Sequence, residues 1–78
     1  MKDTIDNFKT AMEEYRNLNP KFRELIRREA TQELIDCGAH EVGSSDVNHS
    51  IYQMYRQHGS MDNVVQHCLD NFFATVMA

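Results

Sequence analysis

The stretch of sequence that decides the fold lies at residues 61–77 and reads MDNVVQHCLDNFFATVM. Its apolar residues recur at spacings of three and four, which is the period of an α-helix. At 100° per residue they occupy about half of the helix circumference, a wider arc than a helix facing one neighbour needs. The stretch also contains no Lys or Arg. It therefore predicts a helix that protein surfaces cover on several sides, within a packed all-helical domain.

Three breaks divide the rest of the chain into further helices. Asn19 and Pro20 suit the N-cap and the first residue of a helix. Gly38 suits the position after a helix C-terminus, and Gly59, followed by the capping residue Ser60, separates the last two helices. No stretch predicts a β-strand. We therefore expect an all-α fold, a compact bundle of about four short helices over residues 4–18, 20–37, 46–58 and 61–77.

The length of the chain and its links set the expected organisation. Seventy-eight residues make one domain, residues 1–78. The first and last links are about two residues long, and short links favour antiparallel or steeply angled neighbours. We expect two helical hairpins, residues 3–37 and 45–77, that pack on each other through the last helix. The longest link, residues 38–45, is either a plain connector or a binding loop.

The apolar positions of each helix predict the core. Cys68 lies inside the apolar arc of residues 61–77 and predicts a buried thiol. His58 closes the apolar face of the third helix, so we expect a capping or half-buried histidine. Tyr52 faces away from that apolar side, which predicts an exposed aromatic side chain. The residues expected to be substantially buried are Phe8, Met12, Phe22, Ile26, Ile51, Met54, Val65, Leu69, Phe72 and Phe73.

Composition limits the classes of function. The net charge is −4, from 8 basic and 12 acidic residues, which argues against a nucleic-acid or anionic-membrane partner. No continuous apolar stretch is long enough for a membrane span or a signal peptide. Two cysteines make no disulfide framework. These features predict a soluble cytoplasmic protein in a reducing compartment.

Two carboxylates on the second helix are the least ordinary polar pattern. Glu29 and Glu33 stand four residues apart near the apolar side, where carboxylates can bind a metal or serve acid–base chemistry. Cys37 and His40 complete a weak set of candidate metal ligands. The spacing does not match the compact ligand pairs of zinc sites, and the simpler interpretation leaves both carboxylates in water. We therefore expect no metal and no cofactor.

The last two helices, joined at Gly59, have a helix-turn-helix outline. The second helix of such a pair usually presents basic residues to DNA, and residues 61–77 have none. The basic residues of the second helix are matched by acidic ones on the same helix. Direct binding of DNA or RNA is therefore disfavoured.

The sequence contains no catalytic set, so we expect no enzymatic activity. It favours a small non-enzymatic interaction module that acts as an adaptor, inhibitor or regulator by docking on a larger partner protein. Its size and class also suit a product of a phage or mobile element. Tyr, Met and Arg are enriched at interfaces, so the candidate contact residues are Tyr52, Arg23, Arg27, Lys21, Arg28 and Tyr15.

Two alternatives remain open. One is a homodimer formed through the helix Met61–Val76, with a regulatory role associated with nucleic acid. A dimer would cover the excess apolar arc of that helix. The other alternative is a small metal-binding helical protein.

Overall fold

Four α-helices make up the regular secondary structure of the residues that the structure describes. They are α1 (Lys2–Arg16), α2 (Pro20–Asp36), α3 (Ser44–His58) and α4 (Met61–Met77). The structure is a computed structural model that describes residues 2–77 and the side chains of residues 5–77, and no strand occurs among them. The predicted all-α fold with four helices is confirmed, and every helix begins and ends within two residues of the predicted bounds.

The residues expected to start and stop the helices do so. The Asn19 side chain accepts a hydrogen bond of 2.9 Å from the Lys21 backbone N–H, with Pro20 as the first residue of α2. Gly59 has a φ of +88°, in the left-handed region, and ends α3 by donating its N–H to the Tyr55 carbonyl. Ser60 Oγ accepts from the Asn63 N–H at 3.2 Å and so caps α4.

The start of α3 differs from the prediction. The expected helix began at residue 46, but α3 begins at Ser44 with Gly43 in the capping position. Asp46 instead lies in the first turn, where its carboxylate accepts a 3.3 Å hydrogen bond from the Gly43 backbone N–H. A carboxylate in the first turn satisfies a free backbone donor and stabilises the positive end of the helix dipole.

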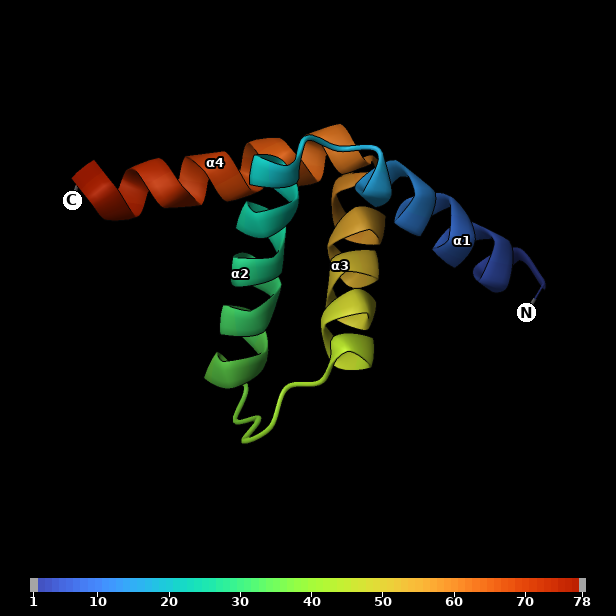
Figure 1. Cartoon of the computed structure of the whole chain (residues 1–78), viewed down its shortest axis with the longest axis horizontal. Helices are drawn as coiled ribbons and strands as arrows, with labels where there is room; N and C mark the ends of the chain where they lie inside the picture. Colours follow the sequence, from blue (N-terminus) through green and yellow to red (C-terminus); the bar gives the residue numbers. More distant parts are fainter. Residues whose placement is uncertain (1, 78) are drawn as a thin grey trace.

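Of the two predicted hairpins, the second is present, since α3 and α4 are in contact and α4 also packs on α2 as expected, but α1 does not pair closely with α2. The largest interface joins α2 to α3, while α1 packs on α3 and α4 and has few contacts with α2. Figure 1 shows α2 and α3 side by side, α4 running across both at a steep angle, and α1 leading away on the other side. The molecule is therefore elongated, with extents of 43 × 28 × 21 Å.

The core lies where α2, α3 and α4 meet. Its largest fully buried side chains come from all three helices: Ile26, Ile51, Met61, Val64 and Cys68. Burial of these groups is the main source of stability for a chain of this size. Of the residues predicted to be buried, Met12, Ile26, Ile51, Met54 and Val65 are buried, and Phe8 and Leu69 are partly buried.

Three predicted core residues are exposed instead. Phe22 has 38% of its surface exposed, because α1 turns away from the first turn of α2. Phe72 and Phe73 are 47% and 54% exposed. They lie in the C-terminal part of α4, which extends beyond α2 (Figure 1). A helical periodicity shows which side of a helix is apolar, but not where along its length the neighbours end.

The prediction that Tyr52 is exposed is wrong. Its side chain is only 6% exposed, and its ring lies edge-to-face with Phe8 at 5.4 Å between centroids. The helical wheel of α3 placed Tyr52 opposite the main apolar side, but α1 covers this second side. Pairing of the rings adds to the free energy of packing α1 on α3.

None of the helices in the described residues has the length and apolar character needed to cross a membrane.

Candidate functional site

A groove with a volume of about 910 Å³ opens where the end of α1, the first half of α2 and the start of α3 meet. We call it the arginine groove, since four arginine side chains line it. One comes from the last turn of α1 and three come from α2. The lining includes Arg16, Arg23, Arg27 and Arg28, with Met12, Tyr15 and Val47 as apolar neighbours.

The charge of the arginine groove is opposite to that of the whole chain. Its lining contains one acidic residue, Glu24, whose carboxylate lies 3.4 Å from Arg28 in an exposed ion pair. Such a pair contributes little to stability. The remaining three arginines give a local positive surface on a chain of net charge −4.

Arg23 is the most enclosed of these arginines. Its side chain is partly buried, and its Nε–H has no hydrogen-bond partner among the described residues. Beside it, the buried Tyr15 hydroxyl donates to the Arg23 carbonyl at 3.2 Å. Burial raises the pKa of Tyr15, although the charges of Arg27 and Arg23 oppose this shift. An unsatisfied buried donor is costly, so an anion that reached it would recover free energy.

The structure brings together four of the six residues predicted to contact a partner. Tyr15, Arg23, Arg27 and Arg28 line the arginine groove. Lys21 is exposed but does not belong to the lining, and the buried Tyr52 lies under α1.

Sequence reasoning missed Arg16, which reaches the same groove from α1. The signal was its place in the last turn of the first helix, a short link away from the basic residues of the second.

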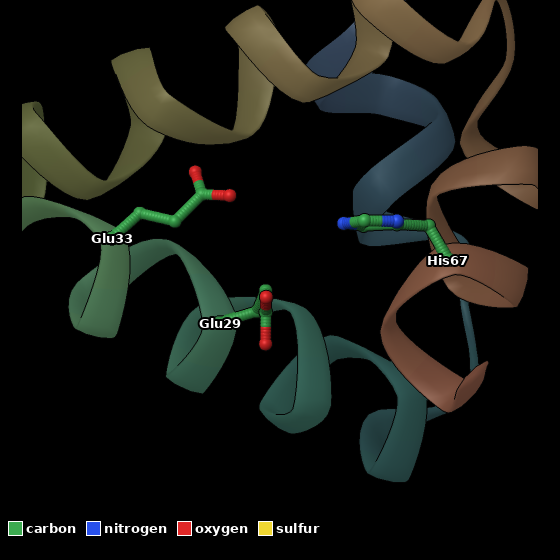
Figure 2. A group of neighbouring side chains, drawn as sticks. All are labelled: Glu29, Glu33 and His67. Atoms are coloured by element: carbon green, nitrogen blue, oxygen red, sulfur yellow. The ribbon is translucent and has the colours of Figure 1, made fainter. Parts of the chain in front are cut away.

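A second polar cluster lies between α2 and α4. Glu29, Glu33 and His67 each offer one ligand atom, and these three atoms lie within 4.8 Å of one another. Figure 2 shows both carboxylates and the imidazole ring pointing into the same space between the two helices. We call these three residues the acid–histidine cluster. Glu29 and His67 are partly buried and Glu33 is exposed, so the expectation of two carboxylates in water holds only for Glu33.

Two neighbours hold the acid–histidine cluster in place. The Asn71 side-chain amide donates to Glu29 Oε1 at 2.9 Å, and its nitrogen lies 3.3 Å from His67 Nε2. The ring of His58, half-buried as predicted, stacks on the ring of His67 with 4.4 Å between centroids. Both contacts restrict the rotation of the His67 imidazole.

The cluster does not include the other two candidate ligands from the sequence. Cys37 and His40 are exposed in the segment that follows α2, and neither belongs to the group. Cys68 is buried as predicted, with 1% of its surface exposed. Burial raises the pKa of its thiol to about 12, and the charges of Glu29 and Glu33 add to the shift.

The C-terminal part of α4 carries the largest apolar exposure. Phe72, Phe73, Val76 and Met77 have between 47% and 82% of their surface exposed. The two phenylalanine rings pack against each other at 5.8 Å between centroids. The excess apolar arc predicted for this helix therefore lies mostly in its uncovered end.

Compared with known proteins, the chain matches no family model, no curated protein and no solved structure.

Proposed function

We propose that this protein is a small non-enzymatic interaction module that docks on a larger partner protein. In this proposal the arginine groove receives an acidic segment of the partner, and the protein acts as an adaptor, inhibitor or regulator by occupying that surface. The observation that carries the proposal is the convergence of four arginines from two helices around one groove that contains a single acidic residue.

The chemistry of arginine supports an anionic occupant. A guanidinium group presents several N–H donors in a rigid plane, which matches a carboxylate in a two-point hydrogen bond. The partly buried Arg23 lies deepest among the four, and its side chain would have to turn toward the occupant to bring its unpartnered Nε–H into such a bond. Arg16 and Arg27 would then supply the surrounding positive potential, which speeds encounter with an acidic surface.

The apolar neighbours favour a peptide over a simple anion. Met12, Tyr15 and Val47 are buried side chains that also border the arginine groove. A segment with an aromatic or aliphatic residue beside its carboxylates would place apolar surface against them. Interfaces of this kind combine an apolar centre with charged residues at the rim.

Charge also favours protein over nucleic acid as the partner. Nucleic-acid affinity depends on many phosphate contacts to basic residues, and the chain as a whole has a net charge of −4. α4 has no basic residue among Met61–Met77. A short acidic segment needs only the local positive surface of the groove.

The test is a titration of the ¹⁵N-labelled protein, followed by NMR, with a synthetic peptide that contains four Glu around one Tyr. The control peptide has Gln in place of each Glu. We expect the Glu peptide alone to shift signals within residues 12–32 and 44–48, and salt to weaken the effect. No shift at millimolar peptide, or equal shifts with both peptides, would overturn the proposal.

Two double variants locate the binding surface. R23A/R27A removes two charges from the groove, while K9A/K21A removes two charges from exposed positions outside its lining. Only R23A/R27A should abolish the shifts. A parallel titration with a short single-stranded oligonucleotide tests the nucleic-acid alternative, and tighter binding of the oligonucleotide than of the peptide would contradict the proposal.

A further inference from the structure

We propose that Glu29, Glu33 and His67 form a binding site for a divalent transition-metal ion, with Zn²⁺ as the best-matched species. The inference does not depend on the arginine groove or its partner. It rests on the position, charge and surroundings of the acid–histidine cluster.

The three ligand atoms are already close to the arrangement that a metal ion needs. Around Zn²⁺, bonds of about 2.0–2.2 Å place tetrahedral ligand atoms about 3.3 Å apart. The atoms of the cluster lie within 4.8 Å of one another. Glutamate side chains have three rotatable bonds, so small rotations of Glu29 and Glu33 suffice to close the remaining distance.

The charge of the cluster is uncompensated. Glu29 and Glu33 are four residues apart on α2, where like charges repel each other. Among the described side chains no Lys or Arg forms an ion pair with either carboxylate, since the ion pair on this helix joins Arg28 to Glu24. A divalent cation between the carboxylates would remove this repulsion.

A hydrogen-bond donor already occupies the space between two of the ligands. The Asn71 amide nitrogen is 2.9 Å from Glu29 Oε1 and 3.3 Å from His67 Nε2. This position suits a group of positive character, because it faces a carboxylate oxygen and an imidazole nitrogen together. On metal binding the amide would rotate and present Oδ1, which is itself a metal ligand.

The imidazole is held in a suitable orientation before any ion arrives. The His58 ring stacks on the His67 ring with an angle of 30° between their planes. Figure 2 shows a ring nitrogen of His67 facing the two carboxylates. A restrained ligand loses less conformational entropy on binding, and such supporting contacts typically change metal affinity by about 10- to 100-fold.

The ligand types select the class of metal. Calcium and magnesium prefer sites made of oxygen atoms, whereas an imidazole nitrogen with two carboxylates suits zinc and neighbouring first-row metals. Glu29, Glu33 and His67 leave a fourth tetrahedral position, which either Asn71 Oδ1 or a water molecule would fill. The ion would join the middle of α2 to α4 and so bind the folded state in preference to the unfolded chain.

The test uses the full chain without an affinity tag and ZnCl₂ as the probe. We expect isothermal titration calorimetry to show one Zn²⁺ per chain. The melting temperature should rise by about 10 °C or more when free Zn²⁺ is 100 times the dissociation constant. Absence of binding, or more than one equivalent of weak sites, would overturn the proposal.

Variants decide whether these three residues hold the ion. E33Q and H67Q should each weaken Zn²⁺ binding by about 10-fold or more. Glu33 is exposed, so E33Q remains informative even if H67Q disturbs the ring stack. Unchanged affinity in E33Q would contradict the site.

Matched controls come from the same chain. H49Q removes an exposed histidine on α3, and C37S/H40Q removes the two sequence-based candidate ligands. Both variants should bind Zn²⁺ as the unmodified protein does. Loss of binding in either control would place the ion elsewhere and overturn the assignment.

Discussion

Tyr55 Oη donates a 2.9 Å hydrogen bond to Glu14 Oε2, and this contact joins α3 to α1 across 41 residues of sequence. The Glu14 carboxylate raises the pKa of Tyr55, because it accepts a hydrogen bond from the neutral phenol and repels a phenolate. Since α1 has few contacts with α2, its place in the fold depends on such contacts with α3 and α4.

Removing the Tyr55 hydroxyl should loosen α1. We expect Y55F to lower the free energy of unfolding by about 1 kcal/mol, the usual net value of a hydrogen bond. Urea denaturation of Y55F, E14A and the double variant would measure this loss of free energy, since alanine, unlike glutamine, leaves no acceptor for the Tyr55 hydroxyl. The two substitutions should be less than additive, because each removes the same bond. Full additivity would show that the contact contributes nothing in solution.

Apolar substitutions should have different effects in the buried core and at the uncovered end of α4. I51A removes a fully buried side chain and should cost about 2–5 kcal/mol. F73A removes a ring that is 54% exposed and should cost less than about 1 kcal/mol in a monomer. Thermal unfolding at low protein concentration compares the two. A large effect of F73A would indicate that another surface, such as a second copy, covers this end.

Substitution by alanine should lower the stability more at Gly59 than at Gly43. A Cβ at Gly59 would meet no atom within 4 Å, so the cost of G59A comes from its φ of +88°. We expect a loss of about 1 kcal/mol from this strain. Gly43 has a φ of −90°, and its Cβ would lie 3.7 Å from the Asp46 carboxylate, an ordinary contact. Because Ala is a poorer N-cap than Gly, chemical denaturation should find a loss of about 0.5 kcal/mol in G43A, smaller than in G59A, and an equal loss in both would refute the strain argument.

Alkaline pH should destabilise the protein through Cys68. Burial raises its pKa from 9.0 to about 12, so its contribution to stability is present below pH 9 and is lost as pH rises toward 12. We expect ionisation of this thiol to lower the free energy of unfolding by about 2 kcal/mol at about pH 10.5, relative to pH values below 9.

The raised pKa values of Tyr15 and Tyr55 act in the same direction, so the wild-type curve alone does not isolate the thiol. The difference in unfolding free energy between wild type and C68A should therefore shrink between pH 8 and 10.5. A constant difference would contradict a buried neutral thiol.

Asn71 provides a substitution with opposite effects on the empty and the metal-bound cluster. N71D replaces the donor to Glu29 with a third carboxylate and should destabilise the metal-free chain by about 0.2–1 kcal/mol. The same carboxylate should tighten Zn²⁺ binding, because it adds a charged ligand. Melting curves with and without ZnCl₂ measure both effects, and weaker binding in N71D would contradict the expected geometry.

The local features of the fold were predictable because they depend on neighbours in sequence. Asn19, Pro20, Gly59 and Ser60 act on backbone groups within one turn, so their roles follow from residue type alone. The burial of Ile26, Ile51 and Cys68 also followed from helical spacing.

The candidate sites were predictable only in part. The arginines of α2 stood out by composition, but their convergence with Arg16 depends on how α1 meets α2. Glu29 and Glu33 were visible as a pair, whereas His67 is more than thirty residues away in sequence and joins them only because α4 crosses α2. Cys37 and His40 were close in sequence but do not share a cluster with them.

By itself the sequence determined four helices, their ends to within two residues and the apolar side of each, because these depend on contacts within a few residues. Tertiary structure decided which helix faces outside the main apolar side are also packed against a neighbour. It also decided how far along each helix that neighbour extends. It buried Tyr52 under α1 and left Phe72 and Phe73 exposed at the end of α4. The physical reason is that crossing angles and helix lengths arise from side-chain packing between distant segments, which periodicity along one helix does not encode.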